Sequence, residues 1–200
     1  MTSLLARIGS WILGSDTPFN PSLSEIIEVR MLLCRFVPVE LADIILHEAT
    51  YYHVRVACVS TPCDISDRHT HRADTPILSI NLTSTEDARL LECVLRVQAV
   101  VKGHDQGWSG YPEDRGTDRN AWTWYSIGSA DPATHEQRLA TNLHAVPRTQ
   151  THGPFVWDRD SELVALLKRD RVLEVWAHAR YPGWVNHVDY AELSVTFFPS

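Results

Sequence analysis

The sequence predicts a mostly β protein, an antiparallel β-sandwich or jelly roll, preceded by a small α-helical segment. Short runs in which apolar and polar residues alternate recur from residue 76 to the C-terminus, and this period of two is typical of half-buried strands. Turn signals separate the runs, with almost no helical periodicity between them. A parallel α/β fold would need helices alternating with the strands, so a sandwich is favoured.

Composition limits the size of the fold and the classes of partner. The chain has 200 residues, of which 44% are hydrophobic and 22% charged, enough for one domain with a short appendage. Its net charge of -7 argues against a nucleic-acid partner and an acidic membrane surface, because phosphate binding needs a basic surface. The sequence has neither an apolar run of membrane-spanning length nor a signal-peptide layout. We therefore expect an intracellular, cytoplasmic protein.

The cysteines and clustered histidines do not predict a metal site. Cys58 and Cys63 are five residues apart, but no second pair at matching spacing follows, as a structural zinc site would require. Buried, reduced thiols in an intracellular protein are the expectation, with no cofactor. His69 and His71 offer two ligands in a polar stretch, and a solvated loop is the alternative that we favour.

Two regions are expected. Residues 1–73 would hold the helical segment and a linker, and residues 74–200 the sandwich. The polar stretch 62–74, rich in Asp, His and Arg, is predicted to be a linker or long loop and marks the boundary. Residues 51–59 are β-branched and aromatic and fit either a helix end or a strand.

Two helices are predicted in the first region. Ser22 followed by Glu25 three residues later is the pattern of an N-cap with a capping box. A second helix is predicted through residues 41–49, with Pro38 in a position that suits its first turn.

The second region alternates along most of its length. Strands are predicted over 77–82, 92–102, 122–127, 139–145 and 151–157. A short helix is predicted over 160–168, with an acidic start and a basic end that suit the helix dipole. Residues 171–198 predict a terminal hairpin, two strands joined by the turn Tyr181-Pro182-Gly183-Trp184.

The stretch Val37-Pro38-Val39-Glu40-Leu41-Ala42-Asp43-Ile44-Ile45-Leu46 resembles the opening of an F-box. The family's hallmark is an apolar-Pro-x-Glu-Leu start with an Ile-Leu pair one turn later. In that family the helix pair docks on the adaptor subunit of a cullin-RING ubiquitin ligase, so the resemblance implies such a partner. The sequence departs from the family before Pro62, where its later helix is not recognisable. The alternative is a local helical hairpin that closes the end of a β domain. The partner-binding residues implied are Val37, Pro38, Leu41, Ile44 and Ile45.

Two aromatic loops are the candidate ligand site. Both join predicted strands, and both mix flat rings with amide, carboxylate and imidazole groups. A sugar offers apolar C–H faces and a ring of hydroxyls, so its sites pair stacked aromatic rings with planar hydrogen-bonding groups; a peptide groove uses the same mixture. The alternative is that the tryptophans plug the sandwich ends while Asp105 and Asn186 tie the loops down. The candidate ligand-binding residues are His104, Asp105, Gln106, Trp108, Tyr111, Tyr181, Trp184, Asn186 and His187.

The second half also resembles a group of uncharacterised fungal proteins that carry a short F-box-like start before a β domain. The resemblance spans about residues 36–198 and brings no activity with it. More distantly, the layout is similar to the sugar-binding F-box-associated domain, a galactose-binding-like sandwich. The matching residues are His104, Asp105, Gln106, Gly107, Trp108, Arg115, Gly116, Thr117, Trp122, Thr123, Trp124, Tyr125, Arg180, Tyr181, Pro182, Gly183, Trp184, Val185 and Asn186.

The expected function is recognition without catalysis. The sequence has no Gly-x-Ser-x-Gly elbow, no Gly-rich phosphate loop and no His-Glu-x-x-His. We therefore expect a lectin-like or peptide-binding module. If the F-box resemblance holds, this module would act as a substrate adaptor for a ubiquitin ligase. One alternative is a metal-dependent hydrolase that uses His104, Asp105 and His187. Another is a structural protein without a ligand.

Overall fold

The structure is a computed structural model that describes residues 19–66, 72–85, 87–129 and 136–199. The chain divides into two compact units, one formed by Met1–His53 and the other by Val54–Phe198. Within the described residues, none of the helices has both the length and the apolar character needed to cross a membrane.

The described residues of the first unit, from residue 19 on, form two helices, α2 (Leu23–Leu33) and α3 (Val39–Glu48). The predicted capping box is present at the start of α2: the Glu25 amide donates to Ser22 Oγ over 3.3 Å, and the Ser22 amide donates to Glu25 Oε2 over 2.9 Å. Pro38 is the N-cap of α3, so its missing N–H costs the helix no hydrogen bond. Both helix starts therefore agree with the sequence-based prediction.

A small core and one ion pair hold α2 against α3. Ile26 of α2 and Ala42 and Leu46 of α3 are buried. The Arg30 guanidinium donates to both carboxylate oxygens of Asp43 over 2.6 and 2.7 Å, a bidentate geometry that fixes the two helices in register. The two helices thus form a defined hairpin with one face turned inward.

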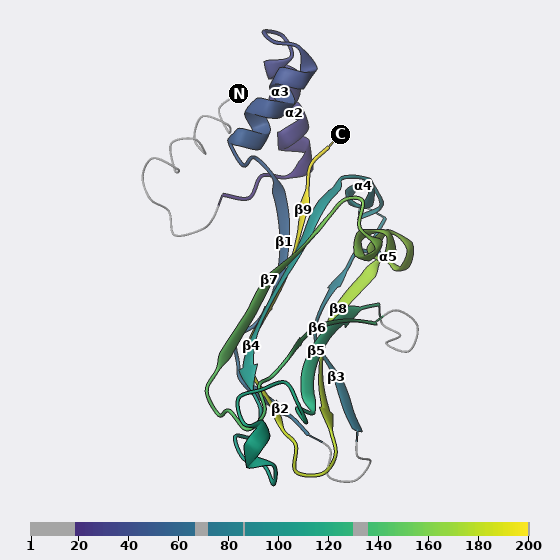
Figure 1. The fold of residues 1–200 in the computed structure, drawn as a ribbon. Coiled ribbons are helices and arrows are strands. Elements are labelled where there is room, and N and C mark those ends of the chain that lie inside the picture. The colour runs from purple at the N-terminus through teal and green to yellow at the C-terminus, as the bar shows by residue number, and fades with distance from the viewer. Residues whose placement is uncertain (1–18, 67–71, 86, 130–135, 200) are drawn as a thin grey trace. The chain divides into compact units, whose positions relative to one another are not determined.

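The second unit is a sandwich of two sheets with short helices between some strands (Figure 1). The helical pieces are α4 (Asp87–Glu92), the 3₁₀ turn η1 (Pro112–Asp114) and α5 (Glu162–Asp170). The strands are β1 (His53–Val59), β2 (Cys63–Ile65), β3 (Arg72–Asn81), β4 (Val94–His104), β5 (Thr123–Gly128), β6 (Glu136–Thr141), β7 (Gln150–Asp158), β8 (Val172–Arg180) and β9 (Asn186–Phe197).

The strand order is that of a jelly roll. One sheet has the order β1-β9-β4-β7, with β2 also paired to β9, and the other has the order β3-β8-β5-β6. With β2 set aside, the first strand pairs with the last, and β3 with β8, β4 with β7 and β5 with β6. Such nested pairs form when one long antiparallel ribbon wraps over itself. The predicted antiparallel sandwich is therefore confirmed.

The core lies between the two sheets and follows the predicted alternation. Val97, Ala99 and Val101 of β4 stand opposite Val195, Leu193 and Ala191 of β9, and all are buried. Leu173, Val175 and Ala177 supply the buried face of β8. Every second residue of these strands points inward, as the pleat of a strand requires.

The predicted terminal hairpin is wrong. β8 pairs with β3 and β5, whereas β9 pairs with β4 and with β2. The turn after Arg180, with Tyr181 at φ 67° and Gly183 at φ 90°, carries the chain from one sheet to the other (Figure 1). Alternation has the same period whether two strands pair in one sheet or face each other across a core.

The region between the helices and the sandwich also differs from the expectation. Residues 51–59, left open by the sequence, contain β1. The stretch 62–74, predicted to be a linker, contains β2 and the first residues of β3, whereas His69 and His71 lie outside the described residues. The chain passes from one compact unit to the other between residues 53 and 54.

Candidate functional site

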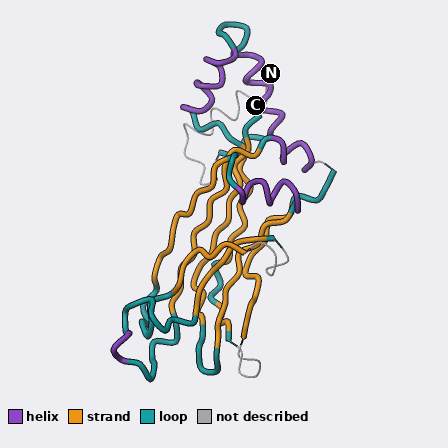
Figure 2. The backbone as a smooth tube through the Cα atoms, turned by 45° about the vertical axis from the view of Figure 1, so that its right-hand side comes forward, coloured by secondary structure: helices purple, strands orange, loops and turns teal. Residues whose placement is uncertain are grey.

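Three strand connections gather at one end of the sandwich, the end away from α4 and α5 (Figures 1 and 2). They are the β4–β5 connection (105–122), the β6–β7 connection (142–149) and the β8–β9 connection (181–185). The Val185 amide donates to Gln106 Oε1 over 3.3 Å, which links the two loops singled out in the sequence. The jelly-roll order thus brings together residues that are about 80 positions apart in the chain.

Asp105 anchors these connections and is fully buried. One carboxylate oxygen accepts from the Gly107 amide over 2.8 Å and the other from the Ala145 amide over 2.6 Å. Burial raises the pKa of Asp105, and the amide donors partly oppose that rise. Because both oxygens are engaged inside the protein, this carboxylate fastens the β4–β5 connection to the β6–β7 connection.

Asn186, at the start of β9, is also fully buried. Its amide nitrogen lies 3.1 Å from two acceptors, the carbonyl oxygens of Trp124 and His178. Its side-chain oxygen accepts from Asn142 Nδ2 over 2.9 Å. Asn186 therefore joins three strand ends, and its polar atoms are directed at backbone and side-chain partners within the fold.

The two histidines of the candidate site form a stacked pair. The rings of His104 and His187 are 4.6 Å apart between centroids, with an interplanar angle of 27°. His187 Nδ1 lies 2.6 Å from Asp64 Oδ1, and His104 Nδ1 lies 2.6 Å from the Asp105 carbonyl oxygen. In the described part of the chain, no three His, Cys, Asp or Glu side chains are grouped to hold a metal ion.

Exposed aromatic rings surround these anchors. Trp108 is 63% exposed, and Tyr111 and Tyr181 are exposed as well. The Trp108 ring covers Gly183, where an added Cβ would lie 3.3 Å from Trp108 Cη2. Trp184 is half-buried, with its ring 5.3 Å from that of His144. We call Trp108, Tyr111, Tyr181 and Trp184 the aromatic rim.

The partner-binding residues that the F-box resemblance implied lie on α3 and just before it. Leu41, Ile44 and Ile45 are 48%, 54% and 44% exposed. Pro38 is exposed and Val37 is half-buried. The apolar side chains of this segment are therefore available on the helical unit.

Sequence reasoning missed a polar network on the outer face of the second sheet. His178 of β8 has Asp74 of β3 at 2.6 Å from Nδ1 and Ser126 of β5 at 2.6 Å from Nε2. Glu136 of β6 places Oε1 at 3.1 Å from the same Nε2. Four adjacent strands contribute one residue each, and no short motif signals such a set.

The network has the order of groups of a nucleophile, a base and an orienting carboxylate. Burial lowers the pKa of His178, against the opposite effects of Asp74 and Glu136, so at neutral pH the ring is neutral. In a neutral ring whose Nδ1–H donates to Asp74, Nε2 accepts from the Ser126 hydroxyl, and it then has no proton to donate to Glu136. Ser126 has no exposed surface, and Trp124 stacks on the His178 ring, so no substrate atom reaches the hydroxyl. The network therefore fixes side chains within the sheet.

A pocket of about 190 Å³ lies beside this network. The guanidinium carbon of Arg138 is 4.7 Å from the centroid of the Trp124 ring, and that of Arg180 is 5.1 Å from it. Trp122 and Tyr181 meet edge to face, with centroids 4.8 Å apart. We call this the aromatic–arginine pocket; it is lined by Ala121, Trp122, Trp124, Arg138, Arg180 and Tyr181.

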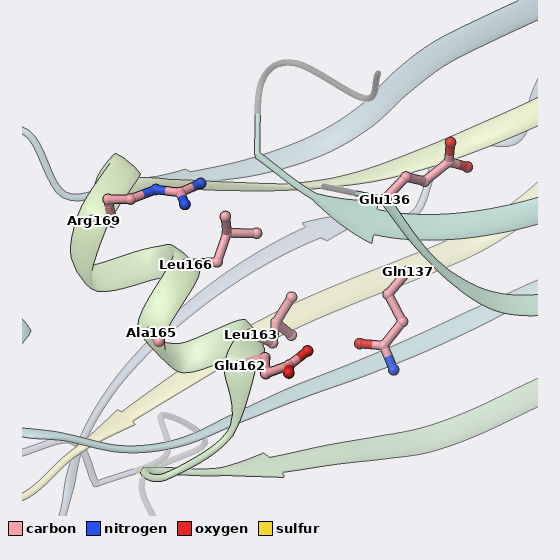
Figure 3. A pocket seen from close by; sticks show the side chains of 7 residues that line it. All are labelled: Glu136, Gln137, Glu162, Leu163, Ala165, Leu166 and Arg169. Carbon is pink, nitrogen blue, oxygen red and sulfur yellow. The ribbon is translucent and has the colours of Figure 1, made fainter. Parts of the chain in front are cut away.

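A larger pocket, of about 480 Å³, lies between α5 and the start of β6 (Figure 3). Leu163 and Leu166 of α5 supply its apolar surface, and Glu136 belongs to the His178 network. The Arg169 guanidinium is already paired with the carboxylate of its neighbour Asp170 at 2.7 Å. The other polar groups in the lining are the Glu162 carboxylate and the Gln137 amide. Together they do not favour one class of ligand, so we assign no ligand to this pocket.

Comparison with known proteins assigns the chain to no family. No family model matches the chain, and no curated protein matches it. A solved structure described as the structure of infectious bursal disease virus Gx strain is similar over 74% of this chain, with 9% identity and a TM-score of 0.38. The match spans 33% of that viral chain.

Proposed function

We propose that the protein is a non-catalytic recognition module whose helical unit docks on another protein. The observation that supports this is the exposed apolar surface of α2 and α3. Exposed apolar patches of this kind mark interaction sites on soluble proteins. The exposed apolar residues of the unit include Ile27, Met31, Leu32, Phe36, Val39, Leu41, Ile44 and Ile45.

The spacing on α3 separates two faces of one helix. Ala42 and Leu46, four residues apart, are buried against α2. Leu41, Ile44 and Ile45 are spaced i, i+3 and i+4, so they share another face of the helix, and all three are exposed. Anchors at this spacing are those with which an amphipathic helix fills a groove of a partner.

The partner that we propose is the adaptor subunit of a cullin-RING ubiquitin ligase. The support is the F-box-like stretch 37–46, whose apolar residues coincide with this exposed face. The Arg30–Asp43 pair holds the hairpin in place, so changes on the exposed face leave its inner contacts intact. In this proposal the sandwich selects the substrate.

The test is calorimetric titration of the purified full chain with the purified adaptor subunit. The double variant Leu41→Asp, Ile44→Asp is expected to bind at least about 100-fold more weakly, since two apolar contacts are lost and charges are buried in their place. Val156→Asp, the same kind of change at an exposed position of β7, is the matched control and should bind like wild type. Equal binding by the double variant and wild type, or no binding by wild type, contradicts this assignment.

A second candidate function is ligand recognition at the aromatic rim, where a sugar or a peptide would bind. The observation that favours it is the exposed Trp108 ring, which lies over Gly183 and so stands where two loops meet. A flat exposed ring offers a stacking surface to a sugar face or to an aliphatic side chain. Asp105 holds the backbone beside this ring by accepting from the Gly107 amide, and Asn186 ties the start of β9 to Trp124 of β5.

Glycan and peptide arrays test the rim. A ligand bound by wild type should be lost in Trp108→Ala and in Trp184→Ala. Trp157→Ala, at a half-buried tryptophan of β7 outside the rim, should keep it. Two blank arrays with folded wild-type protein, or a hit that survives both rim changes, exclude the rim as the recognition site.

A further inference from the structure

We propose that the aromatic–arginine pocket binds an oxyanion carried on a single flat ring, as in an aryl phosphate or an aryl carboxylate. The site lies on the outer face of the second sheet, and of the rim residues only Tyr181 belongs to it. The proposal goes beyond docking by the helical unit and does not depend on it. It also selects a ligand class different from a neutral sugar.

The polar side chains that line the pocket favour an acceptor-rich ligand. Arg138 and Arg180 carry only donors, as does the indole nitrogen of Trp122, and the Tyr181 hydroxyl can donate. Among the described residues that line the pocket, none is a carboxylate or a carboxamide. Neutral sugars present hydroxyl donors that need such acceptors, whereas an oxyanion needs donors alone.

Both guanidiniums keep their charge free of acidic partners in the described part of the chain, where no ion pair involves Arg138 or Arg180. Arg180 Nε is buried and has no hydrogen-bond partner there. A buried donor without an acceptor costs free energy that a bound oxyanion would recover. Guanidinium groups match the planar geometry of carboxylate and phosphate oxygens.

The aromatic floor of the pocket is held in place before any ligand arrives. Trp124 is parallel to His178, with centroids 4.9 Å apart, and His178 is held by Asp74 and Ser126. Trp124 is itself only 6% exposed, so its ring has little freedom to turn. A ring fixed in the free protein lowers the entropy that binding would otherwise cost.

The size of the pocket limits the ligand. A volume of about 190 Å³ is well below the range of roughly 300–1,000 Å³ that drug-sized ligands occupy. One ring with its charged group is therefore the largest part that enters. The net charge of -7 acts weakly here, because charges beyond about 8 Å are screened at physiological ionic strength.

Calorimetric titration of the full chain tests the site with four small probes. Phenyl phosphate and benzoate carry a ring and an oxyanion, benzyl alcohol carries the ring alone, and inorganic phosphate carries the anion alone. We expect the two aryl anions to bind at least tenfold more tightly than either of the others. The order of phenyl phosphate and benzoate then identifies the oxyanion that the pocket prefers.

Arg138→Gln is the decisive variant, because Arg138 is an exposed residue of the edge strand β6 and its replacement leaves the core intact. It should weaken the aryl anions by about 10- to 100-fold, the effect of losing a charge-assisted hydrogen bond. Arg89→Gln, at an exposed cation of α4, is the matched control and should bind like wild type. The proposal fails if the aryl anions do not bind wild type, if benzyl alcohol binds equally well, or if the two variants behave alike. These outcomes are independent of adaptor binding, which is measured on the other unit.

Discussion

Trp124 and His178 are directly opposite each other on neighbouring strands and their rings are parallel, with centroids 4.9 Å apart and an interplanar angle of 7°. The pair connects two features of the outer sheet face. On one side His178 belongs to the buried network with Asp74 and Ser126, and on the other Trp124 belongs to the aromatic–arginine pocket. The polar network therefore acts on the pocket by fixing the ring that forms its floor.

Replacing His178 should change how stability depends on pH. Burial holds the pKa of His178 below its ordinary value of 6.5, although Asp74 and Glu136 oppose that effect and Arg180 adds to it. A lowered pKa means that the unfolded chain binds the proton first, so stability is full above pH 6.5 and falls as the pH drops toward the folded-state pKa. His178→Gln should flatten this part of the profile, as measured by urea unfolding at intervals between pH 7.5 and 5.

A second, half-buried histidine, His152, provides a control for the effect of pH on stability. Burial also lowers the pKa of His152, and His152→Gln should remove only its own share of the slope. At pH 7.5 His178→Gln should cost about 1–3 kcal/mol through the hydrogen bonds to Asp74 and Ser126. An unchanged slope in His178→Gln would mean that the ring titrates as it does in the unfolded chain.

The sequence predicted the sandwich because alternation is a local signal. The pleat of the strand turns Val97, Ala99 and Val101 toward the core and the less buried Gln98 and Val100 away from it. The helix that begins after Ser22 was equally readable, since its capping box lies within four residues. Features that one strand or one turn determines by itself were thus accessible from the sequence.

Pairing between strands was not accessible in the same way. β8 and β9 were predicted to be a hairpin because a Pro-Gly turn separates them, yet they belong to different sheets. Nothing in their alternation distinguishes a partner beside a strand from one across the core. β8 lies between β3 and β5, and β9 pairs with β4, so the pairing depends on strands that are distant in the chain.

The candidate site was predicted in part. The loops around Trp108 and Trp184 do adjoin, as the Gln106–Val185 contact and the position of Trp108 over Gly183 establish. From residue type alone, the buried anchors Asp105 and Asn186 could not be distinguished from exposed residues such as Trp108. The His178 network could not be predicted, since its four residues are brought together only by the order of the second sheet.

Asn186→Ala should destabilise the sandwich, whereas Trp108→Ala should leave its stability nearly unchanged. Asn186 is fully buried and makes three hydrogen bonds, so its removal leaves polar partners unsatisfied at a cost of about 2–4 kcal/mol. Trp108 is 63% exposed, and a change at such a position alters stability by about 0.5 kcal/mol or less. Chemical denaturation of the two variants beside wild type measures both values, and equal losses would contradict the separation of anchor from rim.

Gly103→Ala should be among the most damaging single-methyl changes in the sandwich. A Cβ at Gly103 would lie 2.1 Å from Tyr125 Oη and 2.2 Å from the His187 carbonyl oxygen. Tyr125 is fully buried, and His187 lies on the neighbouring strand β9 where the register with β4 shifts, so neither atom can withdraw without moving the sheet. Overpacking of this kind costs roughly 3 kcal/mol. Gly110→Ala is the matched control, because nothing lies within 4 Å of its added methyl group. Thermal and urea unfolding of the two variants should therefore differ by roughly 3 kcal/mol, and indistinguishable midpoints would show that the β4–β9 contact at Gly103 is looser than the structure has it.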